Sequence, residues 1–257
     1  MDNIKRELAI REQEIKSYVK FLTQLDITNS AIVSSLDDLL LTPSIRPKEE
    51  NLVPDDIKKI LKANLCLMLY NVTEGFIKQS ILNVLDTINN THTYSKLTDN
   101  MKIIWLERCV VWFEYKSDDF KSSGMSKKLF YAKLIDRLGD DLLSFITEEE
   151  KSDPRKFSER FGIPGNVDHT TFKKLADEYG IVLSDRSVFD KEDTLKTLRE
   201  DRNKLAHGNI SFNDFGHTLS VAELVELSND VFEYLGKIAN MFQTYLREEK
   251  YLNEATC

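Results

Sequence analysis

The chain has 257 residues, of which 41% are hydrophobic and 30% are charged, so it can bury the core of one large domain or two small ones. Its net charge of −8 excludes a general nucleic-acid coat, because non-specific binding to phosphates needs a broad positive surface. It contains only nine glycines and five prolines, which favours long helices over many short strands.

The first forty residues are predicted to form a helical extension. Apolar side chains recur at helical spacing within residues 1–25, and a second helical piece is predicted at about 29–41. Three prolines lie in the segment 42–54, which is therefore predicted to be a linker. The resulting organisation is an extension over 1–41, the linker, and a main domain over 55–250 with an inserted segment at about 117–190.

The clearest long helix is predicted over residues 55–88. Asp55 and Asp56 suit its first turn, where acidic side chains favour the positive end of the helix dipole. Gly75 lies in the middle of the helix and predicts close helix packing, because glycine there costs about 1 kcal/mol relative to alanine. Glu74 falls close to the apolar face, where it is either a solvent-facing boundary carboxylate or a functional acid. The buried stripe with a period of 3.6 is predicted at Ile57, Ile60, Leu61, Leu65, Leu69, Val72, Phe76 and Leu85.

Further helices are predicted over residues 101–116 and 126–146. Their core residues are expected to be Trp105, Leu106, Trp112 and Phe113. Downstream, Asp168 is placed to cap a short helix that ends at Gly180.

A helix over about 191–207 is predicted to end at Gly208, and a loop follows it. Ser220 and Glu223 then form the S-x-x-E pattern of a capping box, which opens a last amphipathic helix. The sequence shows no internal repeat and no sustained alternation of the kind that predicts strands. The predicted fold class is therefore all-α, a helical bundle with an N-terminal helical extension.

The cysteines and the apolar runs bear on the compartment. Cys66, Cys109 and Cys257 form no CxxC pair and have no metal-ligand spacing, which suits a reduced, cytoplasmic protein. The N-terminus is charged and lacks the apolar region of a secretory signal. Apolar runs such as 65–69 are too short to cross a bilayer, so no membrane association is expected.

The sequence RNKLAHG, residues 202–208, combines an arginine, an amide and a histidine before a glycine. On an ideal helix Arg202 falls on an apolar stripe, where a guanidinium needs a carboxylate or a phosphate to offset its desolvation. Asn203 and His207 share one face, but His207 lies about 140° away from Arg202. Either the helix distorts before Gly208, or two copies of the helix meet in a symmetric dimer. The residues that share the stripe with the arginine are Leu195, Leu198 and Leu205.

These residue types suit metal-free cleavage of RNA. A histidine can move a proton near neutral pH, and a fixed guanidinium can hold a phosphate. The spacing is equally consistent with a helix that simply runs into its glycine cap. The other histidines, His92, His169 and His217, fall in polar or loop sequences and are predicted to lie at the surface.

Three blocks of sequence, taken in order, resemble the HEPN superfamily, in particular a branch of stand-alone bacterial HEPN-like nucleases. RNKLAHGNISFNDFG (202–216) resembles the R-x4–6-H signature with its following S-F-x-x-x-G stretch. LMLYNVTEGFIKQSI (67–81) resembles the first core helix with its L-Y-N-x-x-E run, and IPGNVDHTTFKKLADEYGI (163–181) resembles the G-N-x-D…Y-G-I element. The first forty residues lie outside this resemblance.

The resemblance implies a helical bundle that dimerises through its motif helices and acts as a metal-independent endoribonuclease, used as a toxin or in defence against phages. It assigns Arg202 and His207 as the catalytic pair, Asn203 as a polar helper and Glu74 as an acid that could pair with Arg202. Arg199 and Lys204 would add local positive charge for RNA. The implied partners are RNA, a second copy and an antitoxin or accessory protein, with no cofactor. Two other functions stay open: a HEPN-like subunit that binds RNA or nucleotides without cutting, and a helical scaffold in which Arg202 is a core arginine.

Overall fold

The structure is a computed structural model that describes residues 2–39, 55–91, 94–104, 106–107, 166–183 and 190–253. Within these ranges the regular structure is helical, apart from one isolated bridge between Leu97 and Leu252. The predicted all-α fold class is confirmed. The chain forms two compact units, unit 1 with Met1–Lys5, Glu74–Glu192 and Gly236–Cys257, and unit 2 with Arg6–Thr73 and Asp193–Leu235.

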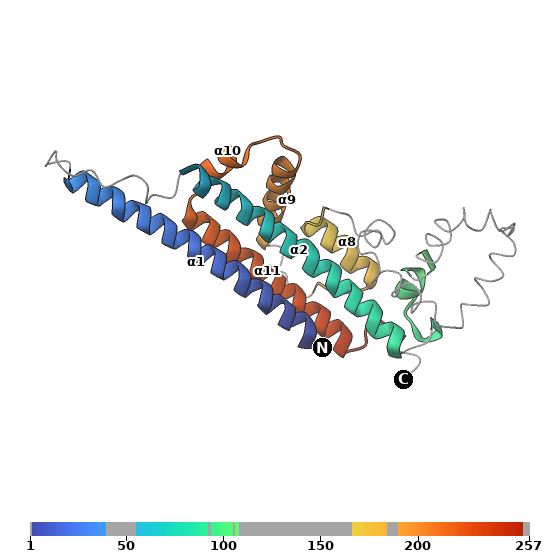
Figure 1. The fold of residues 1–257 in the computed structure, drawn as a ribbon. Coiled ribbons are helices and arrows are strands. Elements are labelled where there is room, and N and C mark those ends of the chain that lie inside the picture. Colours follow the sequence, from blue (N-terminus) through green and yellow to red (C-terminus); the bar gives the residue numbers. More distant parts are fainter. Residues whose placement is uncertain are drawn as a thin grey trace, which may run out of the picture. The chain divides into compact units, whose positions relative to one another are not determined.

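Unit 2 is built on segments of three long helices, α1 (Asp2–Leu39), α2 (Asp55–Thr91) and α11 (Val221–Arg247). Their segments run side by side in Figure 1. Helix α1 is fixed to α2 by polar contacts as well as by its apolar face. The Tyr18 hydroxyl donates to the Leu61 carbonyl at 3.0 Å, and Lys58 lies 3.5 Å from the Asp26 carboxylate.

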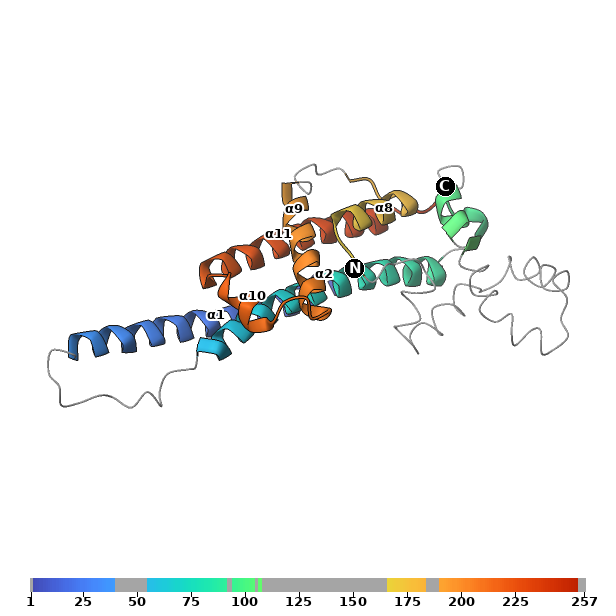
Figure 2. The ribbon, with the colours of Figure 1, turned by 90° about the horizontal axis from the view of Figure 1, so that it is seen from above.

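Two shorter helices complete unit 2, α9 (Glu192–Ala206) and α10 (Phe212–His217). Helix α9 crosses the direction of the long helices, and α10 lies beside the start of α2 (Figure 2). The apolar face of α9 is buried through Leu195, Leu198 and Leu205, as its periodicity predicts. Helix α10 is capped by Ser211, whose hydroxyl accepts from the Asp214 amide.

Helix α10 packs closely against the backbone of α2. A Cβ on Gly216 would lie 1.9 Å from the carbonyl oxygen of Lys59, so only glycine fits this contact. Two hydrogen bonds flank it. The Asn213 amide donates to Asp56 at 2.8 Å, and the Lys62 ammonium donates to the Leu219 carbonyl at 2.8 Å.

Unit 1 packs α8 (His169–Tyr179) with the C-terminal segment of α11. The Tyr245 hydroxyl donates to the Tyr179 carbonyl at 2.7 Å, and the rings of Phe172 and Phe242 lie 6.3 Å apart. The short 3-10 helix η2 (Tyr94–Lys96) precedes the bridge residue Leu97, and the Thr98 amide donates to the Tyr251 carbonyl at 2.9 Å.

The predicted helix caps are confirmed. The Asp168 carboxylate accepts from the Thr171 amide at 2.8 Å, and Gly180 closes α8 with a left-handed φ of 67°. Ser220 and Glu223 form the predicted capping box, since the Glu223 amide donates to the Ser220 hydroxyl and the Ser220 amide donates to the Glu223 carboxylate. The charged Glu223 carboxylate accepts from the Ser220 amide and from the Ser220 hydroxyl, which lowers the pKa of Glu223.

Other predictions are wrong. Helix α1 runs without a break from Asp2 to Leu39, where two pieces were expected. Ile57 and Ile60 are 46% and 40% exposed, because their side of α2 faces solvent at the start of the helix. Gly75 is exposed, with nothing within 4 Å of an added Cβ, so it does not mark close packing. Leu106 is 41% exposed and is not a core residue.

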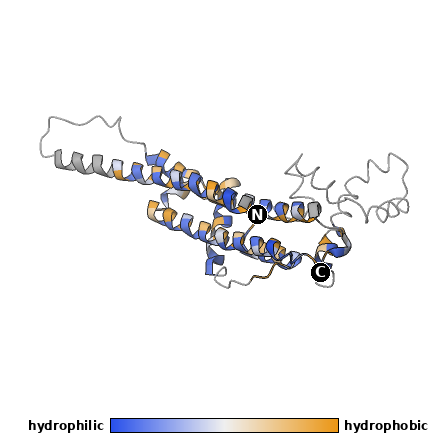
Figure 3. Cartoon of the chain, turned by 90° about the horizontal axis from the view of Figure 1, so that it is seen from below, coloured by the Kyte–Doolittle hydropathy of each residue, from blue (hydrophilic) through white to orange (hydrophobic). Residues whose placement is uncertain are grey.

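Several predicted segments lie outside the described residues. They are the linker 42–54, the helix 126–146, most of 101–116 and most of the inserted segment 117–190, together with Trp105, Trp112 and Phe113. Hydrophobic and hydrophilic residues both occur along each long helix in Figure 3, as in amphipathic helices that bury one side. Among the helices that the structure describes, none is both long and apolar enough to cross a membrane.

Candidate functional site

The RNKLAHG sequence forms the C-terminal end of α9 and its cap. Gly208 adopts a left-handed φ of 70°, a conformation that glycine reaches without steric cost. The Asn209 amide donates to the Lys204 carbonyl at 2.9 Å, and the Gly208 amide donates to the Leu205 carbonyl at 3.2 Å. This pair of bonds is a Schellman cap. His207 therefore lies at the last turn, with its own amide still bonded to the Asn203 carbonyl at 3.0 Å.

Arg202 is half-buried and lies against an aromatic ring of α2. Its Cζ is 4.9 Å from the centroid of the Tyr70 ring, and Tyr70 is only 1% exposed. The Arg202 Nη1 also donates to the Asn203 Oδ1 at 3.0 Å. The guanidinium predicted to lie on an apolar stripe is thus stabilised by a ring face and by an amide oxygen.

Asn203 links Arg202 and His207, which point to different sides of the helix. Arg199, Asn203 and His207 are spaced four residues apart, so they form one row along the surface of α9. Arg202 is next to this row and reaches it through the hydrogen bond to Asn203. Arg199 and Asn203 are half-buried, whereas His207 is exposed. The row therefore presents a guanidinium, an amide and an imidazole in order toward the end of the helix.

Glu74 has a charged partner on its own helix. The Lys78 ammonium donates to the Glu74 carboxylate, one turn further along α2, and the two side chains are 22% and 16% exposed. Glu74 is one turn from Tyr70 in sequence, but it belongs to unit 1 while Tyr70 and Arg202 belong to unit 2. The pairing of Glu74 with Arg202 stays a prediction.

The two basic residues predicted to guide RNA differ in their surroundings. Lys204 is exposed, and its ammonium lies 2.9 Å from the Asp201 carboxylate, which raises the pKa of Lys204 and offsets its charge. It also lies on the opposite side of α9 from Arg202. Arg199 belongs to the row with Asn203 and His207, which makes it the better placed of the two for a phosphate.

The remaining histidines do not extend the site. His217 is exposed at the end of α10, as predicted. The prediction that His169 lies at the surface is wrong, because it is the first residue of α8 and only 2% exposed. Burial lowers the pKa of His169, although Glu192 and Asp168 oppose the shift. His92 lies outside the described residues.

The loop predicted after His207 is partly the helix α10, and this helix holds the end of α9 in place. Only the residues between Ala206 and Phe212 separate the two helices. Because Gly216 and Asn213 anchor α10 on the first turns of α2, the short connection that contains His207 is tied down at both ends. The glycine of the S-F-x-x-x-G pattern, Gly216, thus has a packing reason here.

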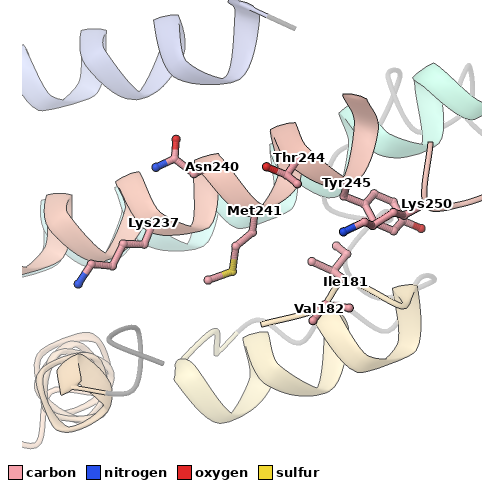
Figure 4. Close-up of a pocket in the computed structure, with 8 residues that line it drawn as sticks. All are labelled: Ile181, Val182, Lys237, Asn240, Met241, Thr244, Tyr245 and Lys250. Carbon is pink, nitrogen blue, oxygen red and sulfur yellow. The ribbon is translucent and has the colours of Figure 1, made fainter. Parts of the chain in front are cut away.

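A separate shallow pocket of about 200 Å³ opens in unit 1 beside α11. Figure 4 shows Met241 and Ile181 between the ammonium groups of Lys237 and Lys250. The Lys250 ammonium lies 2.9 Å from the Glu248 carboxylate, so its charge is already offset. Nothing in the lining selects one kind of ligand. The full lining is Ile181, Val182, Lys237, Asn240, Met241, Thr244, Tyr245 and Lys250.

Across the part of the chain that the structure describes, no three His, Cys, Asp or Glu side chains gather in a way that could hold a metal ion.

Comparison with known proteins identifies the family. No curated protein and no solved structure matches the sequence. The model of the HEPN_MAE_28990-like HEPN family matches residues 1–251, so the match takes in the N-terminal helix α1 as well as the RNKLAHG sequence. The chain belongs to this HEPN family.

Proposed function

We propose that this HEPN protein is a metal-independent endoribonuclease, in which Arg202 and His207 act on the phosphate that is cleaved. The observation that carries the proposal is the row on α9, where Arg199, Asn203 and His207 line up beside the Arg202 guanidinium. A guanidinium and an imidazole within one row suit a reaction that needs charge stabilisation and proton transfer. The sequence resemblance to stand-alone HEPN nucleases adds to it.

The reaction is attack of a ribose 2′-oxygen on the adjacent phosphorus. A bond forms between the 2′-oxygen and phosphorus while the bond from phosphorus to the 5′-oxygen breaks, which leaves a cyclic phosphate and a 5′-hydroxyl. The 2′-hydroxyl loses a proton and the leaving oxygen gains one, so His207 acts as base or acid. Arg202 holds the phosphate and stabilises its growing negative charge.

A dimer through α9 would complete this chemistry. The α9 row of one copy of the protein supplies one imidazole, that of His207. The reaction needs a base on one side of the phosphate and an acid on the other. A two-fold axis beside His207 would bring a second imidazole and a second Arg202 to the same phosphate. The exposure of His207 at the end of α9 leaves it accessible to such a partner. We therefore propose a homodimer, and an antitoxin or accessory protein that binds over the same region.

The test is RNA cleavage by the purified protein and its variants. We expect His207→Ala and Arg202→Lys to fold normally and to lose at least a hundredfold in cleavage. General acid–base catalysis by His207 contributes factors of about 10² to 10⁴, and loss of a charge-stabilising donor such as Arg202 costs about 10² to 10³. The matched control is His217→Ala, which removes another exposed histidine of unit 2 and should cleave at the wild-type rate. Cleavage in excess EDTA should continue.

Each outcome has a clear meaning. Wild-type cleavage by His207→Ala would remove the catalytic assignment, and complete loss in EDTA would point to a metal enzyme. Purified protein that binds RNA but never cuts it would favour the alternative function, a non-cleaving RNA-binding or partner subunit. Expression of the wild type beside both variants, with sequencing of the 5′ ends of cellular RNA, would test the proposed role as a toxin or defence effector and identify the RNA that is cut.

A further inference from the structure

Arg202 of α9 contacts Tyr70 of α2 within unit 2. Tyr70 is among the largest fully buried side chains, so its ring is fixed by the core of unit 2. The Arg202 Cζ lies over this ring at 4.9 Å from the centroid. An aromatic face attracts a guanidinium most strongly where water is excluded, which is the case beneath a half-buried arginine.

The contact also preserves the hydrogen-bonding capacity of the arginine. All five N–H groups of a guanidinium lie in its plane, and an aromatic face stabilises the charge without taking any of them up. A carboxylate in the same place would take two of them in a bidentate pair. The Asn203 Oδ1 accepts from Nη1 at 3.0 Å, which fixes the rotation of the group toward the row that ends at His207.

We propose that Tyr70 is a positioning residue, whose ring holds the Arg202 guanidinium in the orientation that meets the RNA phosphate. This inference rests on the proposed function for the reaction itself. Tyr70 does not touch the RNA in this arrangement, because its ring is buried under Arg202. It acts by keeping the guanidinium desolvated on one side and preorganised for a bidentate contact.

The test compares two substitutions of the same tyrosine. Tyr70→Phe keeps the ring face and should keep kcat within about threefold. Tyr70→Leu keeps an apolar side chain without a ring and should lower kcat about thirtyfold, the factor that corresponds to a desolvated contact between a cation and an aromatic face. The dependence of the rate on pH should stay unchanged, because His207 is untouched. The control is Tyr18→Leu, which removes a half-buried tyrosine of unit 2 that bonds to Leu61 instead.

A double-mutant cycle separates positioning from a general loss of structure. In an Arg202→Lys background, Tyr70→Leu should have no further effect on kcat, because lysine does not use the ring in the same way. Equal losses from Tyr70→Leu in both backgrounds would overturn the proposal. So would equal losses from Tyr70→Phe and Tyr70→Leu.

Two measurements keep the inference distinct from the proposed function. The ring current of Tyr70 should shift the NMR signals of the Arg202 side chain in the wild type and in Tyr70→Phe, but not in Tyr70→Leu. The dissociation constant for a 2′-O-methyl RNA, which cannot be cleaved, should rise about tenfold in Tyr70→Leu alone. If the wild type does not cleave RNA, the proposed function fails, while these two results still decide whether Tyr70 positions Arg202. An unshifted Arg202 signal in the wild type would overturn the inference even if RNA is cleaved.

Discussion

Gly216→Ala should lower the free energy of unfolding through one backbone contact, and Gly75→Ala should raise it. A Cβ at position 216 would lie 1.9 Å from the Lys59 carbonyl oxygen, 2.5 Å from its carbon and 2.7 Å from its Cα. All three are backbone atoms, so no side chain can rotate out of the way. Carbon and oxygen atoms approach to about 3.3 Å at closest, which requires α10 and α2 to separate by about 1.4 Å.

The cost follows from what this separation disrupts. The bonds from Asn213 to Asp56 and from Lys62 to the Leu219 carbonyl are both 2.8 Å long, and each would exceed hydrogen-bonding distance. The first is exposed to solvent and is worth about 1 kcal/mol although its acceptor is a carboxylate, and the second, which is partly buried and involves an ammonium, is worth about 1.5 kcal/mol or more. Partial exposure of Phe215, now 5% exposed, adds about 1–2 kcal/mol. The expected loss of unfolding free energy is therefore about 3–5 kcal/mol.

The assay is urea denaturation followed by far-UV circular dichroism, with Gly75→Ala as the matched control. Gly75 is an exposed glycine inside α2 with nothing within 4 Å of an added Cβ, so alanine there should raise the unfolding free energy by about 1 kcal/mol. If Gly216→Ala unfolds at the wild-type urea concentration, the close approach of α10 to α2 is refuted. Losses of unfolding free energy of similar size in Gly216→Ala and Gly75→Ala would show that both positions are sensitive for a reason other than the close approach of α10 to α2.

Three further predictions concern single buried groups. Tyr245→Phe should lower the unfolding free energy by about 1–3 kcal/mol in urea denaturation, because the Tyr179 carbonyl loses its 2.7 Å donor; an unchanged midpoint would contradict this. Burial raises the pKa of the Cys66 thiol to about 12, so iodoacetamide at pH 8 should leave Cys66 unmodified until urea unfolds the chain. Peptide mass spectrometry would detect the modification, and rapid modification of Cys66 in the folded protein would contradict this prediction. Burial lowers the pKa of His169, so the unfolded chain takes up this proton at a higher pH than the folded chain. The contribution of neutral His169 to the unfolding free energy should be fully present above about pH 6.5 and should be lost as the pH falls below it. His169→Gln should flatten that dependence in denaturation measured at several pH values, whereas an equal slope in both proteins would rule it out.

The features predicted correctly from the sequence are those whose chemistry is local. A capping box needs only Ser220 and Glu223, three residues apart, and the cap of α8 needs only Asp168 and Gly180 at its two ends. The periodicity of α9 likewise identified Leu195, Leu198 and Leu205 as one buried face, because every helix with that spacing places them together. Such signals do not depend on what the helix packs against.

The features that were missed depend on partners far away in sequence. The period of 3.6 groups Ile57 and Ile60 with an apolar stripe, but it does not say where the neighbouring helices end, and these two residues remain exposed. Gly75 and Gly216 look alike as glycines in sequence, yet only the second meets another backbone. The sequence does not predict Tyr70 as a partner of Arg202, because a tyrosine on an apolar face is indistinguishable from an ordinary core residue. The sequence predicted a carboxylate or a phosphate as the partner of Arg202, and in the structure an aromatic face offsets part of the same desolvation.

The anchoring of α10 on α2 has a consequence for how the protein is made. Its hydrogen bonds join residues 157 positions apart, Asp56 to Asn213 and Lys62 to Leu219. Closing a loop of that length costs about 4.5 kcal/mol of chain entropy before any contact offsets it, so this contact forms late. During synthesis the first turns of α2 emerge long before α10 exists to cover them. The segment that carries His207 is therefore fixed only after α10 has been made, and a chain that stops before α10 lacks the anchored form of the candidate site.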